Sequence, residues 1–401
     1  MIFVFASLAL LSLALMIWQW AVARAFPLHR RSADRSFAPP VTILKPLKGA
    51  DATTKENLRS WFAQNYSGEA QVLFGVAAET DPVCEIVREL QKEFPTSNAQ
   101  LIVCPESLGA NAKVSKLIQL LRAAKHEIIV VSDADVRVPQ DFLANAVAPL
   151  QAGQIGLVNC FYRFANPATL AMQWEAVMTN ADFWSQVLQS RSLKPMDFAL
   201  GAVMVTRRKQ IQEIGGFEAI VNCLADDYQL GNRIAKKGYR VELSPVVVEC
   251  WDPPKSWRNV WKHQVRWART IRVCQPVPYF FSILSNVTLW ALAWFLAELF
   301  VGDNTQRFSF SSATGDSTVT FVIQICGLFP ALIMVARIFA AIDLQRRLER
   351  NWSSAIYFWL VPVKDLLQAL VWLLAFAGNK IEWRGEKYRL RRDGTLGKLN
   401  G

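Results

Sequence analysis

Two aspartates at the end of an apolar run are the first residues whose spacing suggests chemistry. The stretch IIVVSDADVRV places Asp133 and Asp135 directly after a short, mostly apolar run, with one residue between the two acids. Two such carboxylates can hold Mg²⁺ or Mn²⁺, and phosphate oxygens of a substrate and water then complete the metal's shell. The same pair can also simply shape the turn that leaves a buried strand. Taken alone, the motif is compatible with both interpretations.

A second acidic cluster lies nearly a hundred residues further along the chain. In NCLADDYQLGNRI, Asp226 and Asp227 stand ahead of a predicted helix. Adjacent carboxylates repel each other, which raises the pKa of one of them and prepares it to act as a general base. The alternative is structural, because acidic side chains are favoured near the positive end of a helix dipole.

Three further stretches carry side chains suited to a nucleotide or a diphosphate. Asp81 in AAETDP could bind a base or ribose, or could cap the helix that Pro82 begins. Lys113 in SLGANAKVSKL could contact a phosphate, or could be a solvated lysine. Arg266 in WKHQVRWART, beside Trp267, could grip a diphosphate with two hydrogen bonds, or could be a cation at a membrane surface.

The elements that would position these residues alternate between strand and helix. Apolar runs predict strands, and amphipathic stretches between them predict helices; the strands are expected at 41–44, 71–76, 99–104 and 127–132, and the helices at 54–64, 82–94 and 112–124. This alternation indicates βαβ units around a mainly parallel sheet. Ligands of such sheets bind at the carboxyl ends of the strands, which is where Asp133 and Asp135 lie.

The composition indicates that this α/β domain is joined to membrane segments. Of the 401 residues, 52% are hydrophobic and 19% are charged, which is too apolar for an ordinary soluble enzyme and too charged for a pure membrane bundle. The net charge of +11 fits an anionic partner, and the 15 Trp and 24 Phe favour a lipid interface over nucleic acid. Seven scattered Cys without a CxxC pair predict reduced thiols, with neither a disulfide frame nor a zinc site.

The termini of the chain suggest how it is placed in the membrane. Residues 1–23 carry no charge and are long enough to span a bilayer, and a basic cluster from Arg24 to Arg35 follows them. By the positive-inside rule, the N-terminus is outside and the next domain is cytosolic. We therefore expect a transmembrane helix at 1–26 and a cytosolic catalytic domain at 40–250.

The C-terminal part is expected to continue with interfacial helices at 251–278, membrane segments at 279–378 and a basic cytosolic tail at 379–401. Of the apolar segments 279–302, 318–342 and 355–378, the last contains Lys364 and Asp365. Central charges cost roughly 2.5–3.5 kcal/mol each in hydrocarbon. We predict three full spans and a broken or re-entrant final segment. The alternative is a fourth span whose Lys364–Asp365 pair faces the protein interior.

In combination, these motifs resemble a known class of enzymes. The order of an Asp, a D-x-D, an acidic Asp and an x-x-Arg-Trp resembles the inverting, metal-dependent GT-A glycosyltransferases of the membrane-bound kind. VTILKPLKG, FGVAAETDP, SDADVRV and WRGEKYRLRRDGT are more closely similar to the ceramide glucosyltransferases of glycosyltransferase family 21. Bacterial lipid glycosyltransferases, including those acting on hopanoids, share most of these stretches. The resemblance covers nearly the whole chain.

The resemblance assigns roles to the residues of this sequence. Asp133 and Asp135 would hold a divalent metal, Mg²⁺ or Mn²⁺, together with the UDP diphosphate, and Asp227 would deprotonate the acceptor hydroxyl. Arg266 and Trp267 would close over the diphosphate and the acceptor. The other substrate-binding residues would be Asp81 (with the uridine), Lys113, Asp226 and His263. His263 is a departure, since related enzymes often have Gln or Arg at this position, although a histidine can still donate to phosphate.

The implied function is the transfer of one sugar from a UDP-sugar to the hydroxyl of a membrane lipid such as ceramide at the cytosolic face. UDP-glucose is the favoured donor. The protein would then be an integral protein of a bacterial inner membrane. A UDP-GlcNAc-dependent enzyme acting on a hopanoid or another lipid is the alternative. A processive polysaccharide synthase shares the carboxylate order but usually needs more membrane helices.

Two hypotheses lie outside this class of enzymes. A phosphotransferase would use Asp133 as a nucleophile, although such enzymes normally carry their D-x-D on the first strand. A catalytically silent membrane scaffold would only bind the nucleotide-sugar or the lipid, and metal-dependent turnover of UDP-glucose would exclude it.

Overall fold

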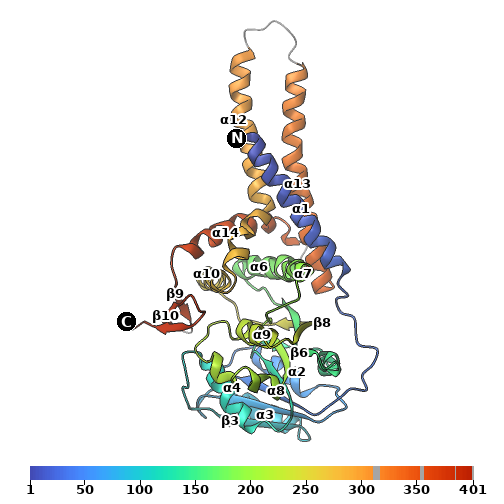
Figure 1. Ribbon diagram of the computed structural model, residues 1–401, viewed down its shortest axis with the longest axis vertical. Helices are drawn as coiled ribbons and strands as arrows, with labels where there is room; N and C mark the ends of the chain where they lie inside the picture. The colour runs from blue at the N-terminus through green and yellow to red at the C-terminus, as the bar shows by residue number, and fades with distance from the viewer. Residues whose placement is uncertain (310–316, 353–355, 384, 400–401) are drawn as a thin grey trace. The chain divides into compact units, whose positions relative to one another are not determined.

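A computed structural model describes residues 1–309, 317–352, 356–383 and 385–399 (Figure 1). The chain forms two compact units that are interleaved along the sequence. The first unit consists of Met1–Ala25, Gln173–Gln189 and His263–Gly378, and the second of Phe26–Met172, Ser190–Lys262 and Asn379–Gly401. The five-part division expected from the sequence stays a prediction.

An eight-stranded sheet forms the centre of the second unit, in the order β3-β2-β1-β4-β7-β6-β8-β5. Its strands are β1 (Val41–Pro46), β2 (Ala70–Val76), β3 (Asn98–Val103), β4 (Ile128–Ser132), β5 (Val136–Arg137), β6 (Ile155–Phe164), β7 (Val203–Arg207) and β8 (Arg240–Cys250). The pairs β1–β2, β2–β3, β1–β4 and β6–β8 are parallel, and the pairs made by β4–β7, β6–β7 and β5–β8 are antiparallel. The four strands predicted from apolar runs are confirmed.

Helices connect the parallel strands, because a parallel connection must cross over the sheet. The predicted crossover helices are confirmed as α2 (Thr54–Phe62), α3 (Val83–Glu93) and α4 (Ala112–Ala123). In α3 the buried side chains Val83, Val87 and Leu90 recur at helical spacing on one face, so that face packs on the sheet. The later helices of this unit are α5 (Phe142–Val147), α8 (Arg208–Glu213) and α9 (Asp226–Lys236), with single 3₁₀ turns at Ala148–Gln151 and Phe217–Ile220.

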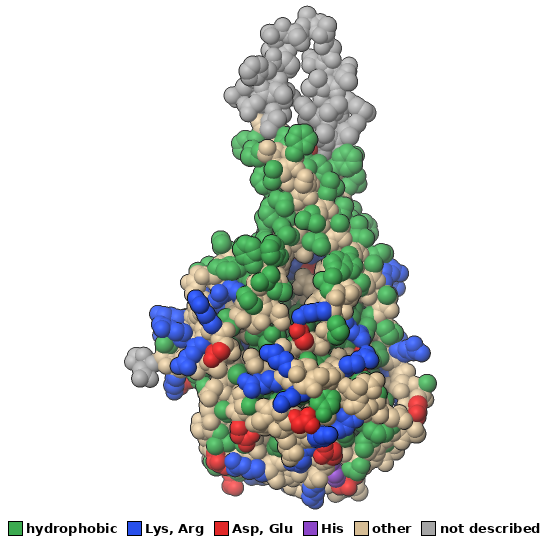
Figure 2. Space-filling view, in the orientation of Figure 1, with side chains coloured by type: hydrophobic (Ala, Val, Ile, Leu, Met, Phe, Trp, Pro, Cys, Tyr) green, Lys and Arg blue, Asp and Glu red, His purple; other side chains and the backbone are tan. Residues whose placement is uncertain are grey.

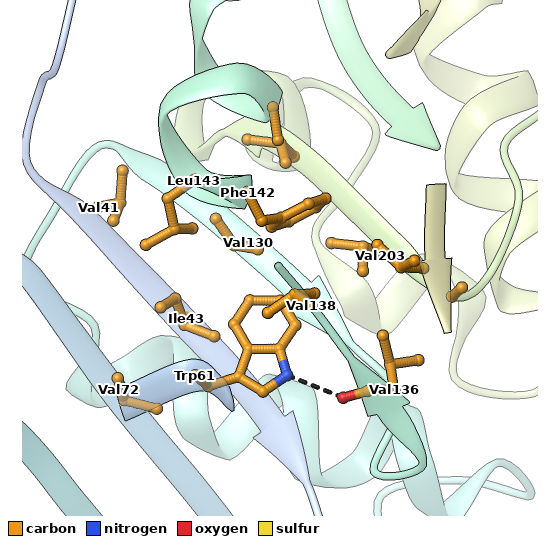
Figure 3. Packing of buried hydrophobic residues seen from close by; sticks show 14 of the residues in the cluster. Val41, Ile43, Trp61, Val72, Val130, Val136, Val138, Phe142, Leu143 and Val203 are labelled. Carbon is orange, nitrogen blue, oxygen red and sulfur yellow. Dashed lines mark hydrogen bonds between the residues drawn. The ribbon is translucent and has the colours of Figure 1, made fainter. Parts of the chain in front are cut away.

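The core of the second unit holds the strand that follows the D-x-D motif. The Trp61 indole of α2 is buried among Ile43, Val130 and Phe142, and its Nε1–H donates to the carbonyl of Val136 at 3.0 Å (Figure 3). The Trp61 and Phe142 rings meet edge to face, with their centroids 5.7 Å apart. Since Val136 directly follows Asp135, this hydrogen bond fixes the end of the D-x-D turn to the core.

The C-terminal tail belongs to the second unit and forms a small antiparallel sheet. Its strands are β9 (Lys380–Trp383), β10 (Glu386–Leu390) and β11 (Leu396–Lys398). Thr395 forms an isolated bridge with Cys223, and the amide of Leu396 donates to the carbonyl of Asn222 at 2.7 Å. The tail therefore pairs with the loop that leads into Asp226 and Asp227.

The first unit contains the candidate membrane helices. Its elements include α1 (Ile2–Ala25), α11 (Pro276–Phe281), a 3₁₀ turn (Ser282–Ser285), α12 (Val287–Ser309), α13 (Ser317–Glu349) and α14 (Leu360–Phe376). Within the described residues, Ile2–Ala25 and Gly327–Glu349 are long and apolar enough to cross a membrane. The pair Pro276–Ser285 and Val287–Phe300, bent by 50°, would add a third crossing if it acts as one span. Figure 2 shows hydrophobic side chains covering the visible described surface where α1, α12 and α13 lie in Figure 1.

The final apolar segment forms the 17-residue helix α14, which is not among the candidate spans. Pro362 lies in its first turn, where a missing backbone N–H is tolerated, so the proline does not break the helix. Lys364 and Asp365 are both buried, whereas the opposite face exposes an apolar stripe that includes Val363, Leu366 and Leu370. The two charges thus face the protein interior, as in the alternative considered from the sequence.

These two charges belong to a buried network of four. Arg337 of α13 contacts Asp182 at 2.8 Å and Asp365 at 2.9 Å, and Lys364 contacts Asp365 at 2.5 Å and also pairs with Asp182. Asp182 comes from a π-helical turn (Met178–Phe183) between α6 (Leu170–Val177) and α7 (Trp184–Leu193). The two positive and two negative charges balance, which offsets the cost of burying each of them.

Candidate active site

The D-x-D turn leaves β4 at the carboxyl edge of the sheet. Its backbone is held from two sides, since the amide of Asp133 donates to the carbonyl of Ala202 at 3.2 Å and the amide of Trp251 donates to that of Asp135 at 3.0 Å. The buried Nζ of Lys45 on β1 donates to the Ser132 hydroxyl at 3.1 Å and to the Asp133 carbonyl at 2.6 Å. The turn is therefore a rigid platform for its carboxylates.

Lys113 joins the two acidic clusters that the sequence holds apart. Its Nζ lies 2.7 Å from Oδ1 of Asp133 and 2.9 Å from Oδ2 of Asp226. Asn111 caps α4 by accepting from the amides of Lys113 and Val114, which directs the lysine toward the acids. Burial alone would lower the pKa of Lys113, but the charges of Asp133 and Asp226 outweigh it and hold the pKa above its ordinary value. The lysine stays charged.

Asp227 has the properties of a base at neutral pH. Burial, and then the neighbouring charge of Asp226, raise its pKa to about 7 from the ordinary 3.8. Its Oδ1 accepts from the amide of Tyr228 at 2.7 Å. A Cβ placed on Gly201 would come within 2.7 Å of the other oxygen, Oδ2, so the glycine leaves room for the carboxylate. The acid is thus held in one orientation.

Asp135 provides the test of whether a metal fits. Burial, followed by the charges of Asp133 and Asp252, raises its pKa to about 7. Among the residues that the structure describes, no side chain donates to or pairs with its carboxylate. A half-buried, unpaired carboxylate beside two others is the environment that a divalent cation would complement.

The donor set defines which kind of metal site would fit. In the described part of the chain, no group of three or more His, Cys, Asp or Glu side chains is arranged to hold a metal ion. A structural zinc site or an all-protein calcium cage would need such a group. Mg²⁺ is often held by one or two carboxylates with substrate phosphates and water. Asp133 and Asp135 fit this last kind of site.

Asp81 lies after β2 and organises its own loop. Its two carboxylate oxygens accept from the amide of Gly49, at 3.0 and 3.1 Å, and Oδ1 also accepts from the amide of Val83 at 3.1 Å. The structural alternative considered from the sequence is therefore present, because Asp81 caps the start of α3. A contact with uridine stays a prediction.

The remaining residues, His263, Arg266 and Trp267, lie on α10 (Trp257–Cys274) in the part of it that belongs to the first unit. The imidazole of His263 and the indole of Trp267 are 4.4 Å apart between ring centroids. The structure thus brings Asp133, Asp226 and Lys113 together in the second unit, and His263 with Trp267 in the first.

Sequence reasoning missed three polar residues, Lys45, Glu175 and Asp252. Lys45 had a signal, since it interrupts the apolar strand VTILKP, and lysine is almost never fully buried unless it is paired. Glu175 and Asp252 had none, because their neighbours His263 and Asp135 are far from them in sequence.

An α/β sheet with acidic side chains converging at the carboxyl ends of its strands places the protein among the open-sheet α/β proteins, whose ligands bind at this edge. The model of "Glycosyl transferase family 21" matches residues 4–396, so the chain belongs to glycosyltransferase family 21. This membership confirms the resemblance noted in the sequence and, together with the sheet, the predicted GT-A fold.

Individual relatives are more distant. The chain is 26% identical to ceramide glucosyltransferase 3 of Caenorhabditis elegans over 222 residues, which cover 55% of this chain and 48% of that protein. It is 22% identical over 282 residues to the probable glycosyltransferase YdaM of Bacillus subtilis, covering 66% of this chain and 63% of the relative. The chain thus spans about half the length of the first of these relatives.

Among solved structures, the chain is similar to the mannosyltransferase PcManGT from Pyrobaculum calidifontis, in complex with GDP-Man and Mn²⁺. The identity is 22%, the TM-score is 0.47, and the match covers 90% of this chain and 99% of that one.

Proposed function

We propose that this protein is an inverting glycosyltransferase that moves one sugar from a UDP-sugar to the hydroxyl of a membrane lipid such as ceramide at the cytosolic face. UDP-glucose is the favoured donor. The observation that carries the proposal is the bridge made by Lys113 between Asp133 and Asp226. This bridge joins a carboxylate pair suited to a metal and a diphosphate with the acidic pair that contains a candidate base.

Asp227 is the proposed general base. A carboxylate whose pKa lies at about 7 is half ionised at neutral pH and still takes up a proton readily. It would accept the proton of the lipid hydroxyl as the oxygen attacks the anomeric carbon. The bond to the UDP oxygen breaks on the opposite face, which inverts the anomeric configuration.

The departing diphosphate needs positive charge. Asp133 and Asp135 are the residues that would hold a divalent metal, Mg²⁺ or Mn²⁺, which when bound would stabilise the negative charge of the leaving UDP. Arg266 is proposed to add a guanidinium with two parallel donors, and Trp267 to cover the acceptor. We assign Asp81 to the uridine, and Lys113 and Asp226 to the region of the diphosphate and the sugar.

The lipid acceptor is supported by the relatives and by the candidate spans. Ceramide glucosyltransferases are among the similar proteins, and Ile2–Ala25 and Gly327–Glu349 are suited to a bilayer. The alternative is a UDP-GlcNAc-dependent enzyme acting on hopanoids or other lipids, which would use these residues in the same roles. We favour a cytosolic orientation in a bacterial inner membrane, because a basic cluster from Arg24 to Arg35 follows the first helix.

The test is an incubation of the full chain in detergent or nanodiscs with Mn²⁺ or Mg²⁺. UDP-glucose and UDP-GlcNAc are each offered with ceramide, a hopanoid or a diacylglycerol, and the lipid products are weighed by mass spectrometry. One added hexose on ceramide is the expected result. A polymer would indicate a synthase, and no transfer from either donor to any lipid would refute the proposal. The Asp227→Asn variant serves as the inactive control, and Glu93→Gln on the exposed face of α3 as the active one.

A further inference from the structure

A buried carboxylate in the first unit holds two side chains of α10. Glu175 of α6 is only 3% exposed, and its Oε1 lies 2.6 Å from Nδ1 of His263. The same oxygen accepts from Nε2 of the Gln264 side chain at 2.7 Å. Two neighbouring residues of α10 are therefore bound to a single carboxylate oxygen.

This contact determines which imidazole nitrogen carries the proton. An ionised carboxylate only accepts hydrogen bonds, so an ionised Glu175, whose Oε1 also accepts from Gln264, pairs with the Nδ1–H form of His263. In the neutral ring, Nε2 then carries the lone pair. Among the described residues Nε2 has no hydrogen-bond partner, and the His263 side chain is 19% exposed. An acceptor atom is thus presented outward.

Aromatic packing fixes the plane of this imidazole. The ring centroid of Trp267 lies 4.4 Å from that of His263. Trp267 also contacts Phe183, with their ring centroids 6.3 Å apart. Phe183 ends the π-helical turn that follows α6. A π turn is wider than an α turn, which changes which residues share a face of the helix, and such turns are frequent at functional sites.

We propose that Nε2 of His263 accepts a hydrogen bond from a hydroxyl of the lipid acceptor, and that Glu175 is the positioning residue that holds the proton of the neutral ring on Nδ1. The inference rests on the proposed function, and it assigns His263 to the acceptor rather than to the diphosphate. Phosphate oxygens are acceptors and do not match a lone pair, whereas an alcohol O–H does. His263 also belongs to the unit that carries the candidate membrane spans. Asp227 keeps the role of base.

The tautomer can be observed directly, because the chain has only three histidines, His29, His126 and His263. Two-bond ¹H–¹⁵N correlation spectra of the full chain, labelled with ¹⁵N-histidine in nanodiscs, distinguish Nδ1–H from Nε2–H rings. The His263→Gln variant assigns the signal. We expect an Nδ1–H ring in the wild type, and an Nε2–H or mixed ring in Glu175→Met. An Nε2–H or doubly protonated ring in the wild type would overturn the inference.

Steady-state kinetics test the role of the atom. One hydrogen bond contributes about 0.5–1.5 kcal/mol, so His263→Gln and Glu175→Met should raise the KM for the lipid about 2- to 12-fold. The KM for the UDP-sugar and the affinity for UDP should stay unchanged. Glu175→Gln keeps a carbonyl acceptor and should restore part of the lipid affinity. The matched control is Gln173→Ala. Gln173 lies on α6, as Glu175 does, and the substitution removes its hydrogen bond to the Tyr357 hydroxyl.

The outcomes separate the two proposals. Weaker UDP binding with an unchanged lipid KM would assign His263 to the diphosphate and overturn the inference alone. A wild-type protein that binds UDP and transfers sugar, with variants unchanged in lipid KM, would also overturn only the inference. A wild type without UDP binding or transfer would overturn the proposed function as well. Unchanged His29 and His126 signals show that each variant is folded.

Discussion

Lys113 and Asp133 form an ion pair of 2.7 Å that ties the start of α4 to the end of β4. Because the same ammonium lies 2.9 Å from Asp226 at the start of α9, one side chain links three elements of the second unit at the carboxyl edge of its sheet. The electrostatics of the candidate site therefore depend on this lysine.

Replacement of Lys113 by Met should destabilise the protein by about 1–3 kcal/mol. Removing one partner from a fully buried ion pair costs about 3–5 kcal/mol, and the Asp133 side chain is 38% exposed, which reduces this effect. The measurement is thermal or denaturant unfolding of the full chain in detergent. The control is Lys55→Met, which breaks an exposed pair with Glu89 and should cost at most about 1 kcal/mol. Equal losses in both variants would show that the bridge is unimportant for stability.

The rate of sugar transfer should depend on the ionisation of Asp227. With a pKa of about 7, the acid is protonated at pH 5 and ionised at pH 9, so kcat/KM should rise tenfold per pH unit below 7 and then level off. Asp227→Asn should lower kcat by about 10²- to 10⁴-fold and abolish this rise, while UDP affinity is retained. A variant with wild-type turnover would exclude Asp227 as the base.

Metal-free protein should lose stability as the pH rises. The pKa values of Asp135 and Asp227 are raised to about 7 in the folded state from about 3.8, so the folded state binds more protons than the unfolded state between these values. Stability contributed by these acids is present below pH 4 and is lost as the pH rises through 7. Tm measured from pH 5 to pH 8 checks this, and Asp135→Asn should flatten the dependence.

Addition of Mn²⁺ should reverse this trend, since the metal binds the ionised carboxylates. The increase in Tm on adding Mn²⁺ is expected to be larger at pH 8 than at pH 5. It should be absent in the Asp133→Asn, Asp135→Asn double variant. An equal increase in that variant would place the metal elsewhere.

The parts of the fold that local pattern determines could be predicted from sequence. Strands β1 to β4 and helices α2 to α4 each have a clear apolar run or an amphipathic face, so their bounds were close to those observed. The proximity of Asp133 and Asp226 could be inferred only through the resemblance, because it depends on the order in which β7, β6 and β8 join the sheet. Nothing within either stretch encodes that order.

Non-local pairing explains the remaining differences. The charge of the basic tail at 379–401 predicts its orientation but no strand, whereas its short polar strands form a sheet and pair with the loop around Cys223. Likewise, Lys364 and Asp365 were treated as a cost of membrane insertion. Their partner Asp182 comes from a segment that sequence reasoning assigned to the catalytic domain, so its contribution to the first unit could not be anticipated.

The buried network around Arg337 yields a final prediction. Among the described residues, Arg337→Met leaves Asp182 and Asp365 with Lys364 as their one remaining counter-charge, so one negative charge stays buried without compensation. Breaking a buried pair in this way costs about 3–5 kcal/mol. The Arg337→Met, Asp365→Leu double variant restores charge balance, with Lys364 facing Asp182, and should recover part of that loss. Thermal unfolding of both variants in detergent measures the difference.

The control is replacement of Arg24, which should have little effect. Arg24 pairs with Asp343 at 3.5 Å, and its side chain is about half exposed. If the double variant is less stable than Arg337→Met alone, the network contributes through its individual hydrogen bonds and not through charge balance.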